Sequence, residues 1–215
     1  YDIVGYDVNS FPILSGTGGH TTTLVRCHRQ GNDATLTVSV PADASERWCG
    51  WVADPEVMGP VNTPPRTMSR AELAAYIARF DQETRLLIGI FDRANGLHVG
   101  FYQIDVSPTH RTAAFNVIVG DKSYWGRKVV LETRAALLDH LFRGGVEKAT
   151  GAPLARNFPA VFNYKAQGWR LEGILKGQCR PMYNGPRLDQ YQFGLLKDEW
   201  IAMRKKAGTN QSVFW

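Results

Sequence analysis

The most informative segment of the chain is Asn116-Val-Ile-Val-Gly-Asp-Lys-Ser-Tyr-Trp-Gly-Arg-Lys-Val-Val-Leu-Glu132. Its β-branched opening favours a strand, and the apolar spacing over residues 127–142 favours a helix. The N–H groups of a first helical turn form an anion site, and Gly126 lets the backbone approach a ligand closely. Arg127 and Lys128 add positive charge there. The segment is therefore either a cradle for a pyrophosphate or a plain strand-to-helix connection with two solvated basic residues.

A second segment reads Asn157-Phe-Pro-Ala-Val-Phe-Asn-Tyr-Lys-Ala-Gln-Gly-Trp169 and follows a short strand expected over residues 146–150. Asn is a favoured N-cap residue, and Gly is favoured just after the end of a helix. We therefore expect a helix that begins after Asn157 and stops at Gly168. Taken alone, the pattern indicates a core aromatic residue at Tyr164.

The rest of the chain alternates short strands and helices. Two runs rich in Thr and Val, residues 21–29 and 34–40, predict a hairpin. Capping-box patterns at Asp43-Ala-Ser-Glu46 and Ser69-Arg-Ala-Glu72 predict two helices, and four prolines over residues 54–66 predict a loop. The other expected elements are strands over 85–91, 97–106, 113–119, 169–175 and 188–196, and a last helix over 198–206. This pattern predicts a mixed α/β, or α+β, fold with a mostly antiparallel sheet.

The composition is that of an ordinary globular protein: 215 residues, 44% hydrophobic and 21% charged. The net charge is +5, but the basic residues are scattered, so no nucleic-acid partner is expected. No apolar stretch reaches the length of a membrane span, no signal peptide opens the chain, and no membrane association is expected. Three widely spaced cysteines (Cys27, Cys49, Cys179) favour a reducing cytoplasm, and no ligand spacing predicts a metal.

Taken together, the two segments resemble the GNAT acetyltransferase superfamily, and in particular the branch that contains the ribosomal-protein N-terminal acetyltransferases. Residues 123–128 stand in the place of the acetyl-CoA signature Gln/Arg-x-x-Gly-x-Gly/Ala, and Glu132 matches the glutamate of the following helix. The later pattern of Asn, Tyr and Gly-Phe is matched by Asn157, Tyr164 and Gly168-Trp169. Two further segments are similar to landmarks of the branch, namely Trp51-Val-Ala-Asp-Pro-Glu-Val57 and Leu196-Lys-Asp-Glu-Trp200.

The resemblance implies a GNAT acyltransferase domain over residues 34–215, after an irregular leader over residues 1–33 with one candidate extra strand. It implies transfer of an acetyl group from acetyl-CoA, as co-substrate, to a primary amine of a protein N-terminus or a small molecule. The amine would attack directly, through a tetrahedral intermediate, where the fourth core strand splays from the next. Tyr164 would then protonate the departing thiolate. The residues implied to bind the cofactor are Val117, Ile118, Val119, Ser123, Trp125, Gly126, Arg127, Lys128, Val129 and Asn157.

The chain also departs from the family pattern. Ser123 stands where Gln or Arg is usual, Lys128 where Gly or Ala is usual, and Ala160 where a serine is common. Ala114 falls where many members carry the glutamate that activates the amine. The proton would then leave through water or through one of three other side chains, namely His110, Asp105 and Glu72. Ala114 and Lys128 favour one alternative function, a non-catalytic acyl-CoA-binding or regulatory module, whereas Tyr164 and Asn157 oppose it.

The acceptor wall is expected from two loops, residues 54–66 and 177–187. Arg180 and Arg187 in the second loop favour an acceptor that carries an acidic group, because they would repel a polycation. The identity of the acceptor and the oligomeric state are left open by the sequence.

Overall fold

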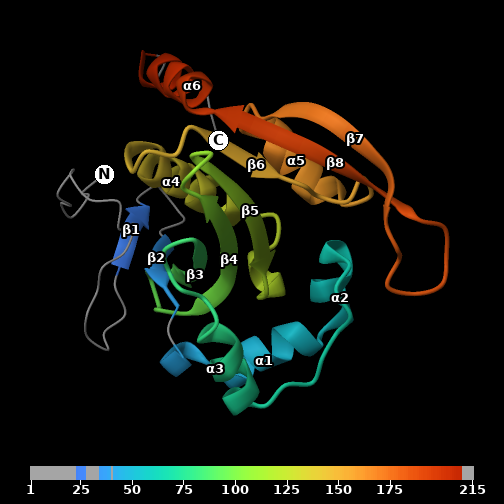
Figure 1. Cartoon of the computed structure of the whole chain (residues 1–215). Coiled ribbons are helices and arrows are strands. Elements are labelled where there is room, and N and C mark those ends of the chain that lie inside the picture. The colour runs from blue at the N-terminus through green and yellow to red at the C-terminus, as the bar shows by residue number, and fades with distance from the viewer. Residues whose placement is uncertain (1–22, 28–33, 40, 210–215) are drawn as a thin grey trace.

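One eight-stranded sheet forms the centre of the computed structural model, which describes residues 23–27, 34–39 and 41–209 (Figure 1). The strands lie in the order β1-β2-β3-β4-β5-β6-β8-β7. Neighbouring strands are antiparallel except β5 and β6, which are parallel. The strands span Thr23–Cys27 (β1), Ala34–Val38 (β2), Arg85–Asp92 (β3), His98–Ser107 (β4), Thr112–Val119 (β5), Lys148–Gly151 (β6), Arg170–Cys179 (β7) and Leu188–Leu196 (β8). The predicted mixed α/β fold is confirmed.

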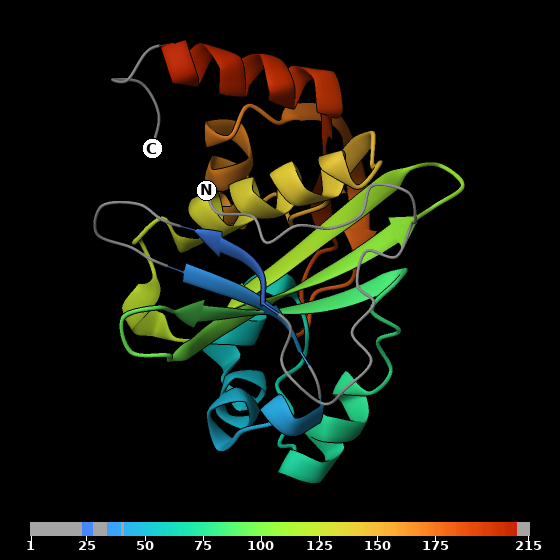
Figure 2. The ribbon, with the colours of Figure 1, turned by 90° about the vertical axis from the view of Figure 1, so that its left-hand side faces the viewer.

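Helices cover both faces of the sheet. Figure 2 shows α4, α5 and α6 on one side of the sheet and α1, α2 and α3 on the other. They span Glu46–Ala53 (α1), Pro55–Met58 (α2), Arg70–Ile77 (α3), Val129–Arg143 (α4), Phe158–Ala166 (α5) and Lys197–Thr209 (α6). Short 3-10 turns lie at Pro41–Asp43, Gly59–Val61 and Lys122–Tyr124. None of these helices is long and apolar enough to cross a membrane.

Each face of the sheet has its own hydrophobic core, because successive residues of a strand point to opposite faces. On β5, Phe115 packs with residues of α4 and α5, whereas Ile118 packs with residues of α1 and α3. On β4, Tyr102 and Phe101 divide in the same way. We call the two sides the α4–α5 face and the α1–α3 face. Along β4 and β5, side chains therefore point alternately to the α4–α5 face and to the α1–α3 face.

The strands β5 and β6 part after three residue pairs, the last of which is Ala114 with Thr150. β5 continues to Val119, whereas β6 ends at Gly151. From Phe115 onward, no described strand pairs with this edge of β5. We call the place where the strands part, beside Phe115 and Gly151, the fork. It is the splay that the resemblance to the GNAT superfamily implies.

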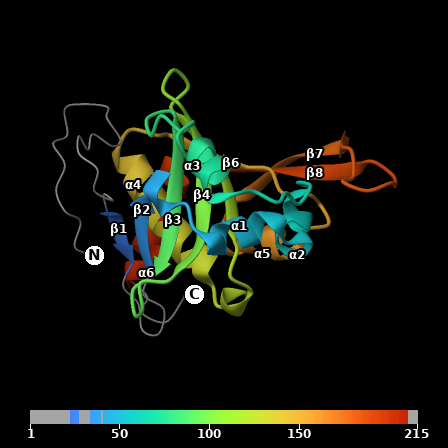
Figure 3. The same cartoon turned by 90° about the horizontal axis from the view of Figure 1, so that it is seen from below.

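The strands β7 and β8 form a long hairpin that extends beyond the rest of the sheet (Figures 1 and 3). The expected strand over residues 169–175 is longer in the structure, because Cys179 still pairs with Leu188. At the other edge, the hairpin expected near the N-terminus is confirmed by the antiparallel pair of β1 and β2. The remainder of the leader, residues 1–22 and 28–33, lies outside the described residues.

Three further differences from the sequence predictions have a clear physical reason. α4 begins later than expected, at Val129, because Lys128 has a left-handed backbone (φ 63°) that a right-handed helix does not contain. The segment 54–66 is not a plain loop but contains α2, since a proline is well tolerated in the first turn of a helix. The residue that caps α1 is Ser45 and not Asp43, which lies in the preceding 3-10 turn.

Candidate active site

The hydroxyl of Tyr164 lies at the fork. Tyr164 belongs to α5 and is 5% exposed. Its hydroxyl donates a hydrogen bond to the backbone carbonyl of Phe115 (3.3 Å), and a Cβ added to Gly151 would overlap the same hydroxyl. The ring stacks on Phe193 with 5.1 Å between the ring centres. The phenol is therefore held against both strands at the point where they separate.

A buried guanidinium lies beside this ring. Arg134 of α4 is 1% exposed, and its Cζ is 4.2 Å from the centre of the Tyr164 ring. It donates hydrogen bonds to the side chain of Gln167 and to the carbonyl of Asn163 (2.8 Å), and no described carboxylate pairs with it. Burial raises the pKa of Tyr164, and the positive charge of Arg134 opposes that rise. Tyr164 is consequently a neutral phenol at physiological pH, able to donate a proton.

The free edge of β5 presents polar backbone groups beyond the fork. The carbonyl of Phe115 points into the gap between β5 and β6, where it accepts the hydrogen bond from the hydroxyl of Tyr164. The carbonyl of Ile118 points the other way, toward β4. Because these directions alternate along a strand, the N–H and C=O groups of Val117 and Val119 also point into the gap. The Val119 carbonyl accepts a hydrogen bond from the indole of Trp125 (2.8 Å). The backbone of Val117 is the part of this edge that can pair with an extended ligand.

The loop between β5 and α4 forms the other half of the site. Gly126 (φ 76°) and Lys128 both have left-handed backbones, and a Cβ at Gly126 would meet no atom within 4 Å. The backbone N–H groups of residues 128–131 have no acceptor among the described residues. They lie at the positive end of the α4 dipole, where an anion is stabilised. The backbone here has the groups that a phosphate requires.

Several side chains expected to bind the cofactor have contacts within the protein. Ser123 donates a hydrogen bond to Asp121 (2.7 Å), and the guanidinium of Arg127 lies 5.2 Å from the centre of the Tyr124 ring. Val129 is buried. These contacts make backbone groups, more than side chains, the principal candidates for holding a phosphate.

The two loops expected to form the acceptor wall are joined by hydrogen bonds. Asn157 caps α5 and also donates a hydrogen bond to the carbonyl of Pro60 (3.1 Å). Asn62 donates to the carbonyl of Arg180 (2.7 Å) and accepts from the N–H of Met182 (3.0 Å). The two loops expected to form the acceptor wall are thus in direct contact, and one of them also contacts α5.

Ion pairs connect the first of these loops, residues 54–66, and the neighbouring α1 to the loop that precedes α4. Lys122, in the loop before α4, pairs with Asp54 (2.7 Å) and with Glu56. Arg47 of α1 pairs with Asp121 (2.7 Å). These pairs hold the α1–α2 segment against the loop that precedes α4.

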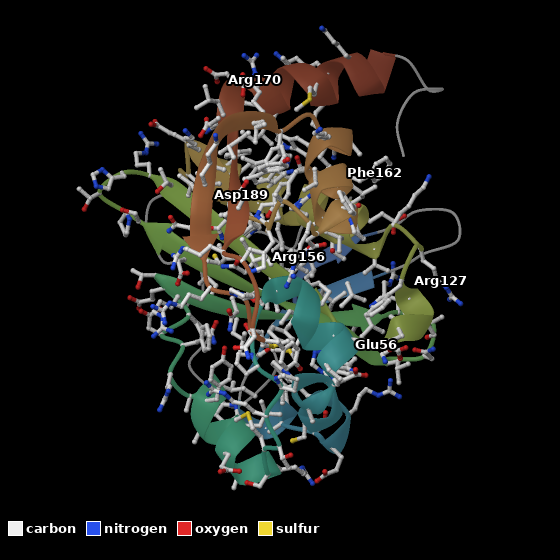
Figure 4. All side chains as sticks on the ribbon, turned by 90° about the vertical axis from the view of Figure 1, so that its right-hand side faces the viewer. Glu56, Arg127, Arg156, Phe162, Arg170 and Asp189 are labelled. Atoms are coloured by element: carbon white, nitrogen blue, oxygen red, sulfur yellow. The ribbon has the colours of Figure 1, made fainter. Side chains whose placement is uncertain are left out.

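The arginines near the acceptor side differ in what they contact. Arg187 donates hydrogen bonds to the carbonyls of Gly177 and Gln178 in its own hairpin, so its charge is engaged there. Arg156, which no sequence motif marks, is exposed, and none of the ion pairs among the described residues includes it. Figure 4 shows it between α5 and α2. The described residues include no group of three or more His, Cys, Asp or Glu that could hold a metal ion.

We predict that Lys128→Gly and Lys128→Ala separate the two roles of this residue. Glycine adopts the left-handed backbone without the steric cost that alanine has there. The free energy of unfolding of Lys128→Gly is therefore expected to exceed that of Lys128→Ala by roughly 1 kcal/mol. Both variants lose the exposed charge and should bind CoA more weakly, most clearly at low salt, since the Debye length is about 10 Å at 0.1 M. Thermal melts and calorimetric titration at two salt concentrations measure both effects. Affinities equal to wild type would show that the ammonium does not reach the phosphates.

The fold and this arrangement define an acetyltransferase domain: a sheet that divides beside a helix N-terminus, with a tyrosine at the division. A family model described as "Acetyltransferase (GNAT) domain" matches residues 35–163. The chain therefore belongs to the GNAT acetyltransferase family.

Solved structures share this fold at low sequence identity. Spermidine N-acetyltransferase from Vibrio cholerae, in complex with CoA and spermine, is 19% identical over 78% of this chain and 98% of that chain, with a TM-score of 0.69. Ribosomal-protein-S5-alanine acetyltransferase from Vibrio fischeri is 13% identical over 82% of this chain and 98% of that one, with a TM-score of 0.67. A ribosomal L7/L12 α-N-protein acetyltransferase is 15% identical over 85% of this chain and 99% of that chain, also with a TM-score of 0.67. No curated protein sequence matches significantly.

Proposed function

We propose that this protein is an N-acetyltransferase that moves an acetyl group from acetyl-CoA to a primary amine of a protein N-terminus or a small molecule. The observation that carries the proposal is the hydroxyl of Tyr164 at the fork, next to a free strand edge and a helix N-terminus. Relatives of similar fold act on spermidine or on ribosomal proteins, which supports an amine acceptor without choosing between the two classes.

Each part of the site has a chemical task in this proposal. The N–H groups of residues 128–131 and the exposed Lys128 would hold the pyrophosphate, and the backbone of Val117 would pair with the pantetheine arm. A strand N–H at the gap would stabilise the oxygen of the tetrahedral intermediate. Tyr164 would give its proton to the departing thiolate. A tyrosine phenol is protonated at neutral pH, and burial raises the pKa of Tyr164 further, so the acid is in its active form.

Binding of acetyl-CoA is expected to raise the Tm. A ligand at 100 times its Kd stabilises the folded state by about 2.7 kcal/mol, which for a domain of this size is a rise of roughly 5–10 °C. A dye-based melt across acetyl-CoA concentrations measures it, with adenosine plus acetate as the control. No rise at millimolar acetyl-CoA, with folded protein, would contradict both the enzyme and the acyl-CoA-binding module.

Turnover distinguishes these two functions. We expect CoA thiol release when acetyl-CoA is supplied with peptides that have a free α-amino group or with spermidine, and none with the N-acetylated forms of the same amines. The alternative, a non-catalytic acyl-CoA-binding module, is favoured by Ala114 in place of the usual glutamate. Stabilisation by acetyl-CoA without thiol release from any amine would favour that alternative.

The proposal includes a cytoplasmic location and no nucleic-acid partner. Cys49 and Cys179 are free thiols, which suits a reducing compartment. Fractionation of cells that express a tagged chain tests the location.

A further inference from the structure

We propose that Asp105, on β4, is the general base that takes the proton from the acceptor amine. This inference rests on the proposed acetyltransferase function. It assigns the task that the residue at position 114 cannot perform, because the alanine there has no titratable group.

The strand register places Asp105 beside the vacant position. Asp105 and Ala114 are directly opposite each other in the antiparallel pair of β4 and β5. Opposite residues in such a pair share a face of the sheet, with Cβ atoms about 4.5–5.5 Å apart. A carboxylate on β4 therefore occupies the neighbourhood that a β5 glutamate would otherwise supply.

The alternation of side chains shows which face this is. Phe101 of β4 and Ile118 of β5 pack into the α1–α3 core, and Asp105 and Ala114 are each four residues away on the same strands. An even spacing along a strand keeps side chains on one face. Asp105 therefore lies on the α1–α3 face, whereas Tyr164 reaches the fork from the α4–α5 face.

The two groups thus flank the reacting centre from opposite sides. Ala114 is the last residue of β5 that pairs with β6, and the next residue, Phe115, accepts the hydrogen bond of Tyr164. An amine that enters on the α1–α3 face would meet Asp105. The thiolate would leave toward Tyr164. Separate faces for base and acid suit a reaction in which the nucleophile enters on one side and the leaving group departs on the other.

The carboxylate of Asp105 is available for this task. Its side chain is 62% exposed, and its ion pair with Arg85 is long, 3.9 Å from Nε to Oδ1. Other polar groups lie on the same face: Asn116 is exposed, and Gln103 donates a hydrogen bond to the hydroxyl of Tyr76. This face of β4 and β5 is polar beside the fork, as a site for a charged amine requires.

The two other candidates are less suited. Glu72 accepts hydrogen bonds from the N–H and the hydroxyl of Ser69, both 2.8 Å, which lower its pKa and occupy one carboxylate oxygen, Oε2, in the cap of α3. His110 lies in the turn beyond the last pair of the ladder, Ser107 with Thr112. That pair is about 10 Å along β5 from Phe115, at roughly 3.3 Å per residue.

The proton balance is complete with these two residues. The amine nitrogen bonds to the acyl carbon while its proton passes to Asp105, directly or through one water. The carbon–sulfur bond then breaks, and the proton of Tyr164 goes to the thiolate. The proton on Asp105 returns through water to the tyrosinate, so both residues are restored and the products are the N-acetylated amine and CoA.

The central test is Asp105→Asn, which keeps the size of the side chain and removes the base. With acetyl-CoA and the best amine from the panel of free-amino peptides and spermidine, kcat should fall by about 10²-fold or more, within the usual range for a general base. The Kd for acetyl-CoA should not change. Arg85→Gln is the matched control, because it breaks the same ion pair and leaves the carboxylate. It should retain wild-type kcat, and an equal loss in both variants would assign Asp105 a structural role and overturn the proposal.

Rescue from the neighbouring strand gives a readout that a structural role would not produce. Adding Ala114→Glu to Asp105→Asn returns a carboxylate to the same face, and kcat should recover by at least tenfold. A double variant that folds but does not recover kcat would overturn the proposal. A wild-type kcat in Asp105→Asn, together with a reduced kcat in Glu72→Gln or His110→Gln, would also overturn it. If wild type releases no thiol with any amine, the acetyltransferase function itself fails. If wild type turns over and Asp105→Asn does so equally well, only this assignment fails.

Discussion

Tyr164→Phe is expected to lower kcat by about 10²–10⁴-fold, the usual contribution of general acid catalysis, and to leave the Kd for acetyl-CoA nearly unchanged. The phenylalanine ring can keep its stack on Phe193 and its contact with Arg134, so only the hydroxyl at the fork is lost. Without that hydroxyl, the departing thiolate must take its proton from water.

Thiol release and calorimetry on the same samples measure both quantities. Tyr191→Phe is the matched control, because Tyr191 lies in the same aromatic cluster on β8. The pH profile gives a second readout. The protonated phenol is the active form and burial raises its pKa, so the wild-type rate should fall only above the usual range of tyrosine. An unchanged kcat in Tyr164→Phe, when the chemical step limits the rate, would remove the hydroxyl from the mechanism.

Gly151→Ala is expected to harm both stability and activity. The added methyl group would overlap the hydroxyl and ring of Tyr164, and both groups are buried. Overpacking of this kind costs about 1–3 kcal/mol, a fall in Tm of roughly 2–12 °C for a domain of this size. A displacement of about 1 Å in a reacting group can cost 10²-fold in rate, and a loss of that order is expected in kcat.

Gly173→Ala provides the control for this substitution. Gly173 also lies in a strand, β7, but a Cβ there would meet no atom within 4 Å. Its Tm and kcat should stay close to wild type. If Gly151→Ala has the same Tm and kcat as wild type, the fork can accommodate the added methyl group, and the close packing of Tyr164 against Gly151 does not limit stability or activity.

Features with local signals could be predicted from the sequence. Ser69 and Glu72 form the reciprocal capping box that their spacing predicts, and Gly96, which follows Asn95 between β3 and β4, has the positive φ that is typical of an Asn-Gly turn. Each of these depends on residues within a few positions of one another. The family resemblance supplied what local signals lack, namely the fork where β5 separates from β6, whereas the parallel pairing of these two strands was not predicted.

The features that were missed depend on contacts between distant parts of the chain. Arg134 lies in an amphipathic segment where a charged residue suggests a solvated face, but α5 and its aromatic side chains bury it. Asn62 lies 118 residues from Arg180, to whose carbonyl it donates a hydrogen bond. The left-handed backbone of Lys128 likewise depends on how the loop joins β5 to α4, and side-chain spacing does not report it.

The contacts of Asn62 and Asn157 have a consequence for engineering. The turn at residues 59–62 holds two neighbouring segments in place. The carbonyl of Pro60 accepts a hydrogen bond from Asn157, the N-cap of α5, and the side chain of Asn62 forms hydrogen bonds with the β7–β8 loop. Grafting a foreign segment into either loop alone would leave an amide or carbonyl unpaired across the joint. A change of acceptor preference is therefore best sought by transplanting residues 59–62 and 180–182 as one unit, with Asn157 retained.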